Sequence, residues 1–346
     1  MMREQLLSLG MALGAMAMLA GGGTGSAKAQ QPLEASVGYY PGALISLPAF
    51  VANDEKFFEK RGLKVELVPI ANGPAMTSAV ASGSVTFVNN SWDNLIVAVQ
   101  SGLPIRGVAG STIRMPFGFI ARKGIDLPHL KDGYPAVIKD LVGKNWGVLA
   151  LGVSLQYISQ KILTDAGFKA DDVTFLAVGL PNTARPALQR GTVDTYLSVE
   201  PLPSIVAAKG EGTVVLNLAE NEGPEFFRNL GYNGWWASNA TIDGKPEVVS
   251  RFVGAMQDAY CWYSKPENFA KVVTIMKQYA AVPDLSDKEY TDMVKRILPT
   301  YGLDITSRTI ESWSSLLLEQ KQIKAPMPRA GVIAAAAGAE NFACAR

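Results

Sequence analysis

Along the chain, short apolar runs with the spacing of β-strands alternate with apolar positions at helical spacing. In the first part, this pattern predicts strands at residues 34–39, 64–70, 85–89 and 105–109, with helices at about 47–61, from 73 onward and at 91–101. After Arg122 the rhythm restarts, with strands at 145–149, 173–178 and 193–198 and helices at 155–166 and 183–190. Beyond residue 236 the pattern is helical, at about 246–264, 266–281, 286–298 and 306–320. Such alternation is typical of βαβ units and mainly parallel sheets, and it indicates the α/β class.

The two halves of this pattern resemble each other. Residues 79–85 (AVASGSV) are matched 108 positions later by residues 187–193 (ALQRGTV), each a helix end, a glycine and a strand start. Any junction between a helix and a strand can look like this, but the restarted rhythm favours two similar α/β lobes. The extended segments near 115–122 and 232–238 then predict two crossovers that form a hinge.

We expect the chain to divide accordingly. One lobe would comprise residues 30–115 and 235–346, including C-terminal helices that pack on the lobes, and the other would comprise residues 116–234.

The first thirty residues have the pattern of an export signal. Arg3 is followed by an uncharged run of 15 residues from Leu6 to Ala20, and Ala27-Lys28-Ala29 forms an A-x-A cleavage pattern. The apolar run is shorter than the roughly 20 residues that span a bilayer. We therefore predict a cleavable signal peptide at residues 1–29 and a mature protein in the periplasm.

Charge and cysteine content narrow the class of protein further. The 346 residues contain 32 Lys and Arg against 31 Asp and Glu, a balance that argues against nucleic acid as a partner. Cys261 and Cys344 belong to no metal-binding pattern, so we expect neither a metal nor a cofactor. In an oxidising compartment they would form one disulfide or remain as two buried thiols, and the sequence leaves both open.

Few residues suggest catalysis. His129 is the single histidine and lies in a stretch expected to be a loop, which makes a Ser-His-Asp triad improbable. No G-x-S-x-G or phosphate-binding-loop pattern occurs. A binding protein is therefore expected rather than an enzyme.

The loops that follow the predicted strands carry neutral hydrogen-bonding and aromatic residues. In open α/β sheets ligands bind beyond the carboxyl ends of the strands, so these loops are the candidate site. Helix capping and turn chemistry explain many of the same residues without a ligand. The candidates are Tyr39, Tyr40, Asn72, Gly73, Asn89, Asn90, Ser91, Trp92, Gly152, Val153, Ser154, Tyr157, Asn182 and Glu200.

Two further residues have competing interpretations. Arg114, beside the predicted hinge, would clamp a carboxylate or sulfonate, or else form a salt bridge between the lobes. Trp92 would form a wall of the cleft, although packing in the core is the commoner role for a tryptophan.

Four segments resemble a known family. Residues 56–67 (KFFEKRGLKVEL) are similar to the "FFEKEGLDVEL" signature of exported substrate-binding proteins for nitrate, sulfonates, taurine and thiamine-precursor pyrimidines. Residues 81–85 (ASGSV) resemble the family's "ASGSVDF", and residues 140–148 (DLVGKNWGV) its "DLKGKKVAV". Residues 191–194 (GTVD) with Glu200-Pro201 resemble "GQVDA…EP".

The resemblance implies a type II periplasmic binding protein. Such a protein would close on a small-molecule ligand and deliver it to an ABC permease in the inner membrane. A monomer suits a carrier that docks on a permease, and the sequence itself leaves the oligomeric state open. The family's aspartate after "GSV" is Thr86 here, and Asn89, Asn90 and Trp92 replace smaller residues, which favours a bulkier organic anion such as a sulfonate or aromatic carboxylate. The alternatives are a ligand sensor for a membrane receptor and a pyrimidine-synthesis enzyme on the same fold.

Overall fold

The computed structural model describes residues 31–335, 337 and 342–344. The predicted signal peptide lies outside the described residues.

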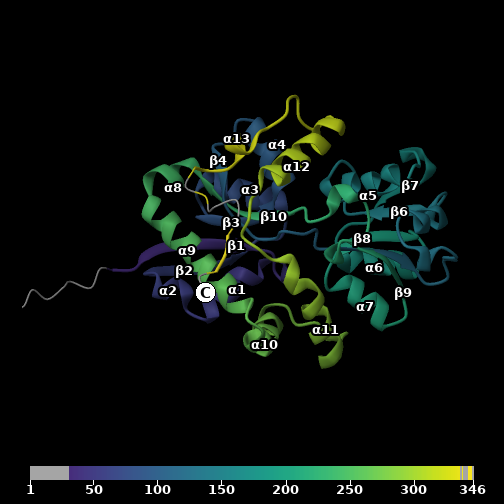
Figure 1. The fold of residues 1–346 in the computed structure, drawn as a ribbon, viewed down its shortest axis with the longest axis horizontal. Helices are drawn as coiled ribbons and strands as arrows, with labels where there is room; N and C mark the ends of the chain where they lie inside the picture. Colours follow the sequence, from purple (N-terminus) through teal and green to yellow (C-terminus); the bar gives the residue numbers. More distant parts are fainter. Residues whose placement is uncertain (1–30, 336, 338–341, 345–346) are drawn as a thin grey trace, which may run out of the picture. The chain divides into compact units, whose positions relative to one another are not determined.

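Five strands form the first sheet, in the order β2-β1-β3-β10-β4 (Figure 1). They are β1 (Leu33–Tyr39), β2 (Leu63–Pro69), β3 (Phe87–Ser91), β4 (Ile105–Gly110) and β10 (Asn233–Ser238). β1 pairs with β2 and β3 in parallel, whereas β10 is antiparallel to β3 and to β4. Four strands of this sheet therefore run in one direction and β10 runs against them.

The second sheet has the order β7-β6-β8-β5-β9. Its strands are β5 (Phe117–Arg122), β6 (Asn145–Val148), β7 (Thr174–Ala177), β8 (Thr195–Val199) and β9 (Gly212–Asn217). β5 is the antiparallel strand here, between β8 and β9. Both sheets thus have the same topology, with one reversed strand in the fourth position, and the α/β class predicted from the sequence is confirmed.

The repeated segment occupies equivalent places in the two sheets. α3 (Gly73–Ser82) ends at Gly83 before β3, and α6 (Pro181–Gln189) is followed by Gly191 before β8. Both glycines have a positive φ, +75° and +70°, which a residue with a Cβ adopts only with strain. The sequence match between residues 79–85 and 187–193 therefore reflects the same turn from a helix into the third strand of each sheet.

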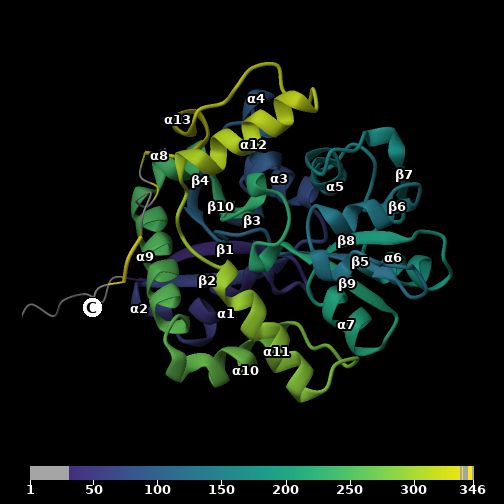
Figure 2. The same cartoon turned by 45° about the vertical axis from the view of Figure 1, so that its right-hand side comes forward.

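Helices cover both faces of the first sheet. On one face α1 (Leu47–Asp54) and α9 (Pro246–Tyr263) bury a core in which Phe252 stacks on Phe87 with ring centroids 3.9 Å apart. On the other face α4 (Trp92–Gln100) and α12 (Ser307–Glu319) pack side by side (Figure 2). The alternating side chains of the strands supply both cores, because successive residues point to opposite faces.

The prediction of a single helix over residues 47–61 is wrong in one respect. This segment contains two helices, α1 and α2 (Phe57–Lys60), which are separated at Lys56, whose φ of +62° breaks the helical path. Elements that the hydrophobic pattern did not predict are β9, α7 (Leu202–Ala208) and α8 (Asn239–Gly244).

The remaining elements are short or lie toward the C-terminus. The helices are α5 (Ser154–Asp165), α10 (Phe269–Tyr279), α11 (Asp287–Ile297) and α13 (Arg329–Val332). The 3₁₀ turns are η1 (Leu44–Ser46), η2 (Leu130–Asp132), η3 (Ala136–Leu141), η4 (Ala170–Asp172), η5 (Leu218–Glu220), η6 (Glu225–Phe227), η7 (Pro266–Asn268) and η8 (Leu298–Thr300). In the part of the chain that the structure describes, no helix has the length and apolar character needed to cross a membrane.

A disulfide connects Cys261, in α9, to Cys344, near the C-terminus. The sequence left open whether these cysteines form a disulfide or remain as two buried thiols, and in the structure they form the disulfide. It closes a loop of 83 residues and ties the C-terminal segment to the helix that covers the first sheet.

Removal of this bridge should reduce stability, because the cross-link restricts the unfolded chain. We expect the double substitution Cys261→Ser with Cys344→Ser to lower the free energy of unfolding by about 2–4 kcal/mol. Urea denaturation measures this loss, and reduced wild-type protein serves as the matched control. Equal midpoints for the variant and the oxidised wild type would show that the bridge contributes nothing.

Candidate functional site

A buried carboxylate lies where two helices begin. Asp93 is the second residue of α4, directly after β3, and only 4% of it is exposed. The hydroxyl of Ser154, the first residue of α5, donates a hydrogen bond to Asp93 Oδ2. α5 follows β6 of the second sheet, so this bond joins the carboxyl-end loops of the two sheets. The positive end of each helix dipole also favours a negative charge at this point.

The charge of Asp93 acts on three tyrosines. Burial raises the pKa values of Tyr40, Tyr157 and Tyr232, and the nearby carboxylate of Asp93 raises them further. Burial also raises the pKa of Asp93 itself, and hydrogen bonds from Ser154, from Ser91 and from the backbone offset this only in part. The three phenols therefore stay protonated around a carboxyl group that is itself costly to ionise.

Asn90 connects the loops of the first sheet. Its Oδ1 accepts a hydrogen bond of 2.9 Å from the Tyr40 hydroxyl, and its Nδ2 donates to Gly73 O at 3.1 Å. Asn94 Nδ2 donates to Ser91 Oγ at 3.0 Å, one turn of helix away. Tyr40, Gly73, Asn90 and Ser91, all predicted from the sequence, are thereby brought together.

The loop before α5 holds Ser154 in place. Tyr157 donates from its hydroxyl to Gly152 O at 2.6 Å, and Gly152 N donates to Gln156 Oε1 at 2.6 Å. Gly152 has a φ of +77°, and Val153 is the residue that precedes the helix. These contacts connect the predicted residues Gly152, Val153, Ser154 and Tyr157 to Asp93. We call Asp93, Tyr40, Asn90, Ser91, Ser154, Tyr157 and Tyr232 the Asp93 cluster.

Trp92, by contrast, is a core residue. Its ring is fully buried against the first sheet, so close to Gly234 that a Cβ added there would lie 1.8 Å from Trp92 Cη2. A Cβ added at Gly107, on the neighbouring strand, would likewise lie too close to the Trp92 ring. The expectation that Trp92 forms a wall of the cleft therefore has no support, because its side chain lies in the apolar layer.

Other predicted residues form separate contacts. Tyr39 packs edge-on against Phe50 with centroids 5.3 Å apart, and Asn72 caps α3 by accepting a hydrogen bond from Ala75 N at 2.9 Å. Asn182 is exposed in the first turn of α6.

Asn89 points to the other face of β3 from Asn90. Its Oδ1 accepts a hydrogen bond from Asn233 Nδ2 at 3.0 Å, and both side chains are buried. The structure thus assigns Asn89 a contact between strands β3 and β10 rather than a place in the Asp93 cluster.

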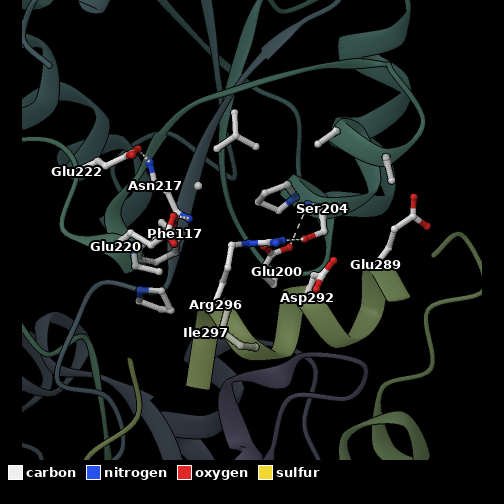
Figure 3. A pocket seen from close by; sticks show the side chains of 17 residues that line it. Phe117, Glu200, Ser204, Asn217, Glu220, Glu222, Glu289, Asp292, Arg296 and Ile297 are labelled. Atoms are coloured by element: carbon white, nitrogen blue, oxygen red, sulfur yellow. Dashed lines mark hydrogen bonds and ion pairs between the residues drawn. The ribbon is translucent and has the colours of Figure 1, made fainter. Parts of the chain in front are cut away.

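Glu200 lines a different cavity, of about 400 Å³, between α7 and α11 (Figure 3). Arg296 extends from α11 toward Glu200, 3.6 Å away, and donates to Ser204 Oγ at 2.6 Å. Burial raises the pKa of Glu200, and Ser204 and Arg296 counteract that rise. Arg114 also lies outside the Asp93 cluster, in an adjoining cavity with Arg296.

Thr86 stands where the family that the sequence resembles has an aspartate, and in the structure it forms hydrogen bonds with Ser36. Its Oγ1 accepts a hydrogen bond of 3.0 Å from Ser36 N, and Ser36 Oγ accepts one of 3.0 Å from Thr86 N. This reciprocal pair joins the start of β3 to β1.

Two members of the Asp93 cluster were not among the predicted site residues. Asp93 lies in the first turn of a helix, two residues after the serine that precedes it, a position where acidic residues are common for electrostatic reasons alone. Tyr232 is 139 residues farther along the chain, and its O accepts a hydrogen bond from Trp92 N at 2.9 Å. Only the pairing of β10 with β3 brings Tyr232 to the site, and no local pattern could indicate that.

The hydrogen bonds that the single histidine forms in the described part of the chain do not involve the Asp93 cluster. His129 lies in the loop after β5, and its Nδ1 is 2.5 Å from Asp140 Oδ1. Among the described residues there is no group of three or more metal-binding side chains.

Solved structures with the same fold include periplasmic binding proteins. The aliphatic sulphonate-binding protein SsuA of Escherichia coli superposes with a TM-score of 0.69 at 17% identity, covering 87% of this chain and 97% of that one. The nitrate-binding protein NrtA of Synechocystis gives a TM-score of 0.59 at 14% identity, covering 75% and 70%. The fold is therefore that of the periplasmic binding proteins, as the sequence motifs implied.

The chain belongs to the NMT1/THI5-like family, whose model matches residues 45–268. The riboflavin-binding protein RibY of Chloroflexus aurantiacus is 26% identical over 65% of this chain, which spans 60% of RibY. The formylaminopyrimidine-binding protein of Halalkalibacterium halodurans is 23% identical over 84% of each chain. A pyrimidine phosphate synthase of Schizosaccharomyces pombe is 26% identical over 44% of this chain and 41% of its own.

The close contact of Gly234 with Trp92 gives a test of the core. Gly234→Ala should destabilise the protein by about 1–3 kcal/mol, because the new methyl group overlaps the indole ring. Gly244→Ala, where a Cβ meets nothing within 4 Å, is the control.

The second variant in this test is Trp92→Phe, which removes the ring atoms nearest Gly234. We expect Gly234→Ala to cost less in that background, as a double-mutant cycle measured by thermal or urea unfolding would show. Strictly additive effects would contradict the proposed overlap.

The raised pKa of Asp93 also predicts a pH dependence. Since the folded protein binds this proton more tightly than the unfolded chain does, the free energy of unfolding should fall as pH rises from the ordinary carboxyl range through the raised pKa. Asp93→Asn removes that contribution, so its stability relative to wild type should increase with pH. Urea unfolding between about pH 4 and 8 measures the difference, with the exposed Asp171→Asn as control. Parallel profiles for wild type and Asp93→Asn would contradict it.

Proposed function

We propose that this chain is the exported solute-binding component of an ABC importer and that it captures a small nitrogen heterocycle of the pyrimidine type. The observation that carries the proposal is the hydrogen bond between Asp93 and Ser154, which joins the loops at the carboxyl ends of the two sheets. This is where open α/β sheets bind their ligands.

A carboxylate at this position selects for hydrogen-bond donors. Asp93 Oδ2 accepts a hydrogen bond from Ser154, whereas Oδ1 is buried and lacks a hydrogen bond of good geometry among the described residues. The N–H or amino group of a heterocycle would pair with such oxygens, whereas a bare anion would be repelled at a short distance. We therefore replace the organic anion expected from the sequence with a neutral or cationic ligand that carries donors.

The residues around Asp93 suit a flat ring. Tyr40, Tyr157 and Tyr232 surround the carboxylate, and their aromatic faces can pack on a planar ligand. Their hydroxyls stay protonated at neutral pH and add hydrogen-bonding capacity without adding charge.

The similar proteins support the same choice. By their names, two of the relatives found by sequence bind riboflavin and formylaminopyrimidine, both nitrogen heterocycles. The sulfonate- and nitrate-binding proteins share the fold at 14–17% identity. Heterocycle binding therefore agrees with the sequence relatives and with the chemistry of Asp93.

Ligand capture would use the hydrogen bond described above. In this mechanism a donor group of the ligand takes the place of the Ser154 hydroxyl at Asp93, and Ser154 then becomes free to hydrogen-bond the ligand from the other sheet. Hinge closure about the two crossovers would enclose the ligand until the protein docks on the permease. Cleavage after residue 29, export to the periplasm and a monomeric state complete the proposal.

One observation favours a second candidate, an enzyme of pyrimidine synthesis. The relative from Schizosaccharomyces pombe carries the name of a synthase. In this chain the single histidine is hydrogen-bonded to Asp140 and lies outside the Asp93 cluster, which makes binding the better-supported function.

A ligand screen tests the proposal directly. Mature protein (residues 30–346), refolded to remove any carried ligand, would be titrated with aminopyrimidines, riboflavin, alkanesulfonates, aromatic carboxylates and nitrate. We expect aminopyrimidines or riboflavin to raise the melting temperature by a few degrees at saturation. Stabilisation by sulfonates, carboxylates or nitrate in place of heterocycles would overturn the ligand class.

Asp93→Asn tests the site itself. Loss of the charged acceptor should weaken heterocycle binding at least about tenfold in calorimetry. Asp171→Asn, the same chemical change at an exposed position, should bind as wild type does. Unchanged affinity in Asp93→Asn would show that the ligand binds elsewhere.

A further inference from the structure

A second cavity lies apart from the Asp93 cluster and has a volume of about 520 Å³. Its charged lining consists of Arg114, Lys295, Arg296, Glu220 and Asp292. It adjoins the cavity of Figure 3, with which it shares Arg296, Glu220 and Asp292.

Arg114 is the unusual member of this set. Its Nε is buried and has no hydrogen-bond partner, and the guanidinium forms no ion pair with any residue that the structure describes. A guanidinium keeps its charge at every physiological pH, so it cannot avoid this cost by losing a proton. A buried N–H group without an acceptor is expensive, so an acceptor bound beside Arg114 would lower that cost.

The carboxylates that line the cavity already have partners. Asp292 Oδ2 is 2.6 Å from Lys288 Nζ, and Glu220 Oε2 accepts from Asn217 Nδ2 at 2.7 Å. Arg296, in turn, is directed toward Ser204 and Glu200 (Figure 3).

Lys295, which is exposed, is the second cation in the cavity that forms no hydrogen bond or close ion pair with the described residues, although its charge acts on the carboxylate of Asp292. Its position in the last turn of α11 is favourable for a cation, because the C-terminal end of a helix dipole is negative. That accounts for a lysine in this turn, but not for the unpaired Nε of Arg114 in the lining of the same cavity.

The backbone fixes Arg114 relative to Lys295. Ile113 N donates to Thr300 O at 2.7 Å, and Gly302 N donates to Ser111 O at 3.2 Å. The segment that leaves β4 is therefore paired with the segment that follows η8, five residues after Lys295. The guanidinium of Arg114, which can donate two parallel hydrogen bonds, and the ammonium group of Lys295 belong to the lining of the same cavity. Such a pair of groups suits an oxyanion.

We propose that this cavity is a binding site for a small inorganic oxyanion, of the size and charge of phosphate or sulfate, held chiefly by Arg114 and Lys295. The site is independent of the heterocycle proposed for the Asp93 cluster. Its lining comes from the crossover after β4, from η5 after β9 of the second sheet, and from α11 and η8. A bound oxyanion would therefore stabilise the packing of these three segments together.

Inorganic phosphate is the probe for this site. The melting temperature of the mature protein should rise in sodium phosphate relative to sodium chloride of the same ionic strength, and a parallel series in sodium sulfate and sodium acetate compares tetrahedral with planar oxyanions. Saturable stabilisation by phosphate or sulfate is the expected result. Equal melting temperatures in phosphate, sulfate and chloride would overturn the proposal.

Variants assign the effect to the cavity. Arg114→Gln and, separately, Lys295→Gln should each weaken phosphate binding at least about tenfold, whereas Lys131→Gln, at an exposed position in η2, should leave it unchanged. Lys295→Gln keeps the test valid if Arg114→Gln fails to fold. Asp93→Asn should retain the phosphate response, which separates this site from the heterocycle site. Unchanged phosphate binding in both cavity variants would place the anion elsewhere and refute the assignment.

Discussion

The proposed binding chemistry depends on one buried carboxylate. Asp93 lies at the start of α4 with its charge opposite the start of α5, and the Ser154 hydroxyl is its partner from the second sheet. Placing a carboxylate in so dry an environment costs free energy, which is why burial raises its pKa. The two helix starts, the serine and the surrounding tyrosines together make the charge tolerable. A group tolerated at such a cost is characteristic of a functional site more than of a structural one.

The positions that the sequence predicted well are those set by local rules. Strand ends, helix caps and glycine turns are determined by neighbouring residues, so β1, β6 and α5 were found from pattern alone. The same pattern placed Asn90 and Ser154 at the ends of strands and the starts of helices, while their role in binding stays a prediction. The two lobes were predicted for the same reason, because the rhythm of strands and helices repeats.

The errors have a different physical origin. Trp92 and Asp93 are consecutive at the start of α4, where adjacent side chains diverge by about 100° around the helix axis, so one enters the core and the other the site. From the sequence we expected Trp92 in the site because it is an aromatic residue in a polar loop, but Trp92 lies in the core and its neighbour Asp93 in the Asp93 cluster. Tyr232 and the residues that line the cavity with Arg114 are brought into place by contacts between distant segments. β9 was missed because its short apolar run follows a glycine-rich turn without a strong alternation.

The order of strands in the sheets also constrains how the chain is made. All five strands of the second sheet lie between residues 117 and 217, whereas the first sheet has β10, residues 233–238, between β3 and β4. A growing or translocating chain can therefore complete the second sheet while the first still lacks an inner strand. Until β10 arrives, β3 and β4 both expose an unpaired edge, the kind of surface that associates with other chains. The interval between the appearance of residue 110 and that of residue 238 is thus the part of synthesis or export in which this protein most needs protection from aggregation.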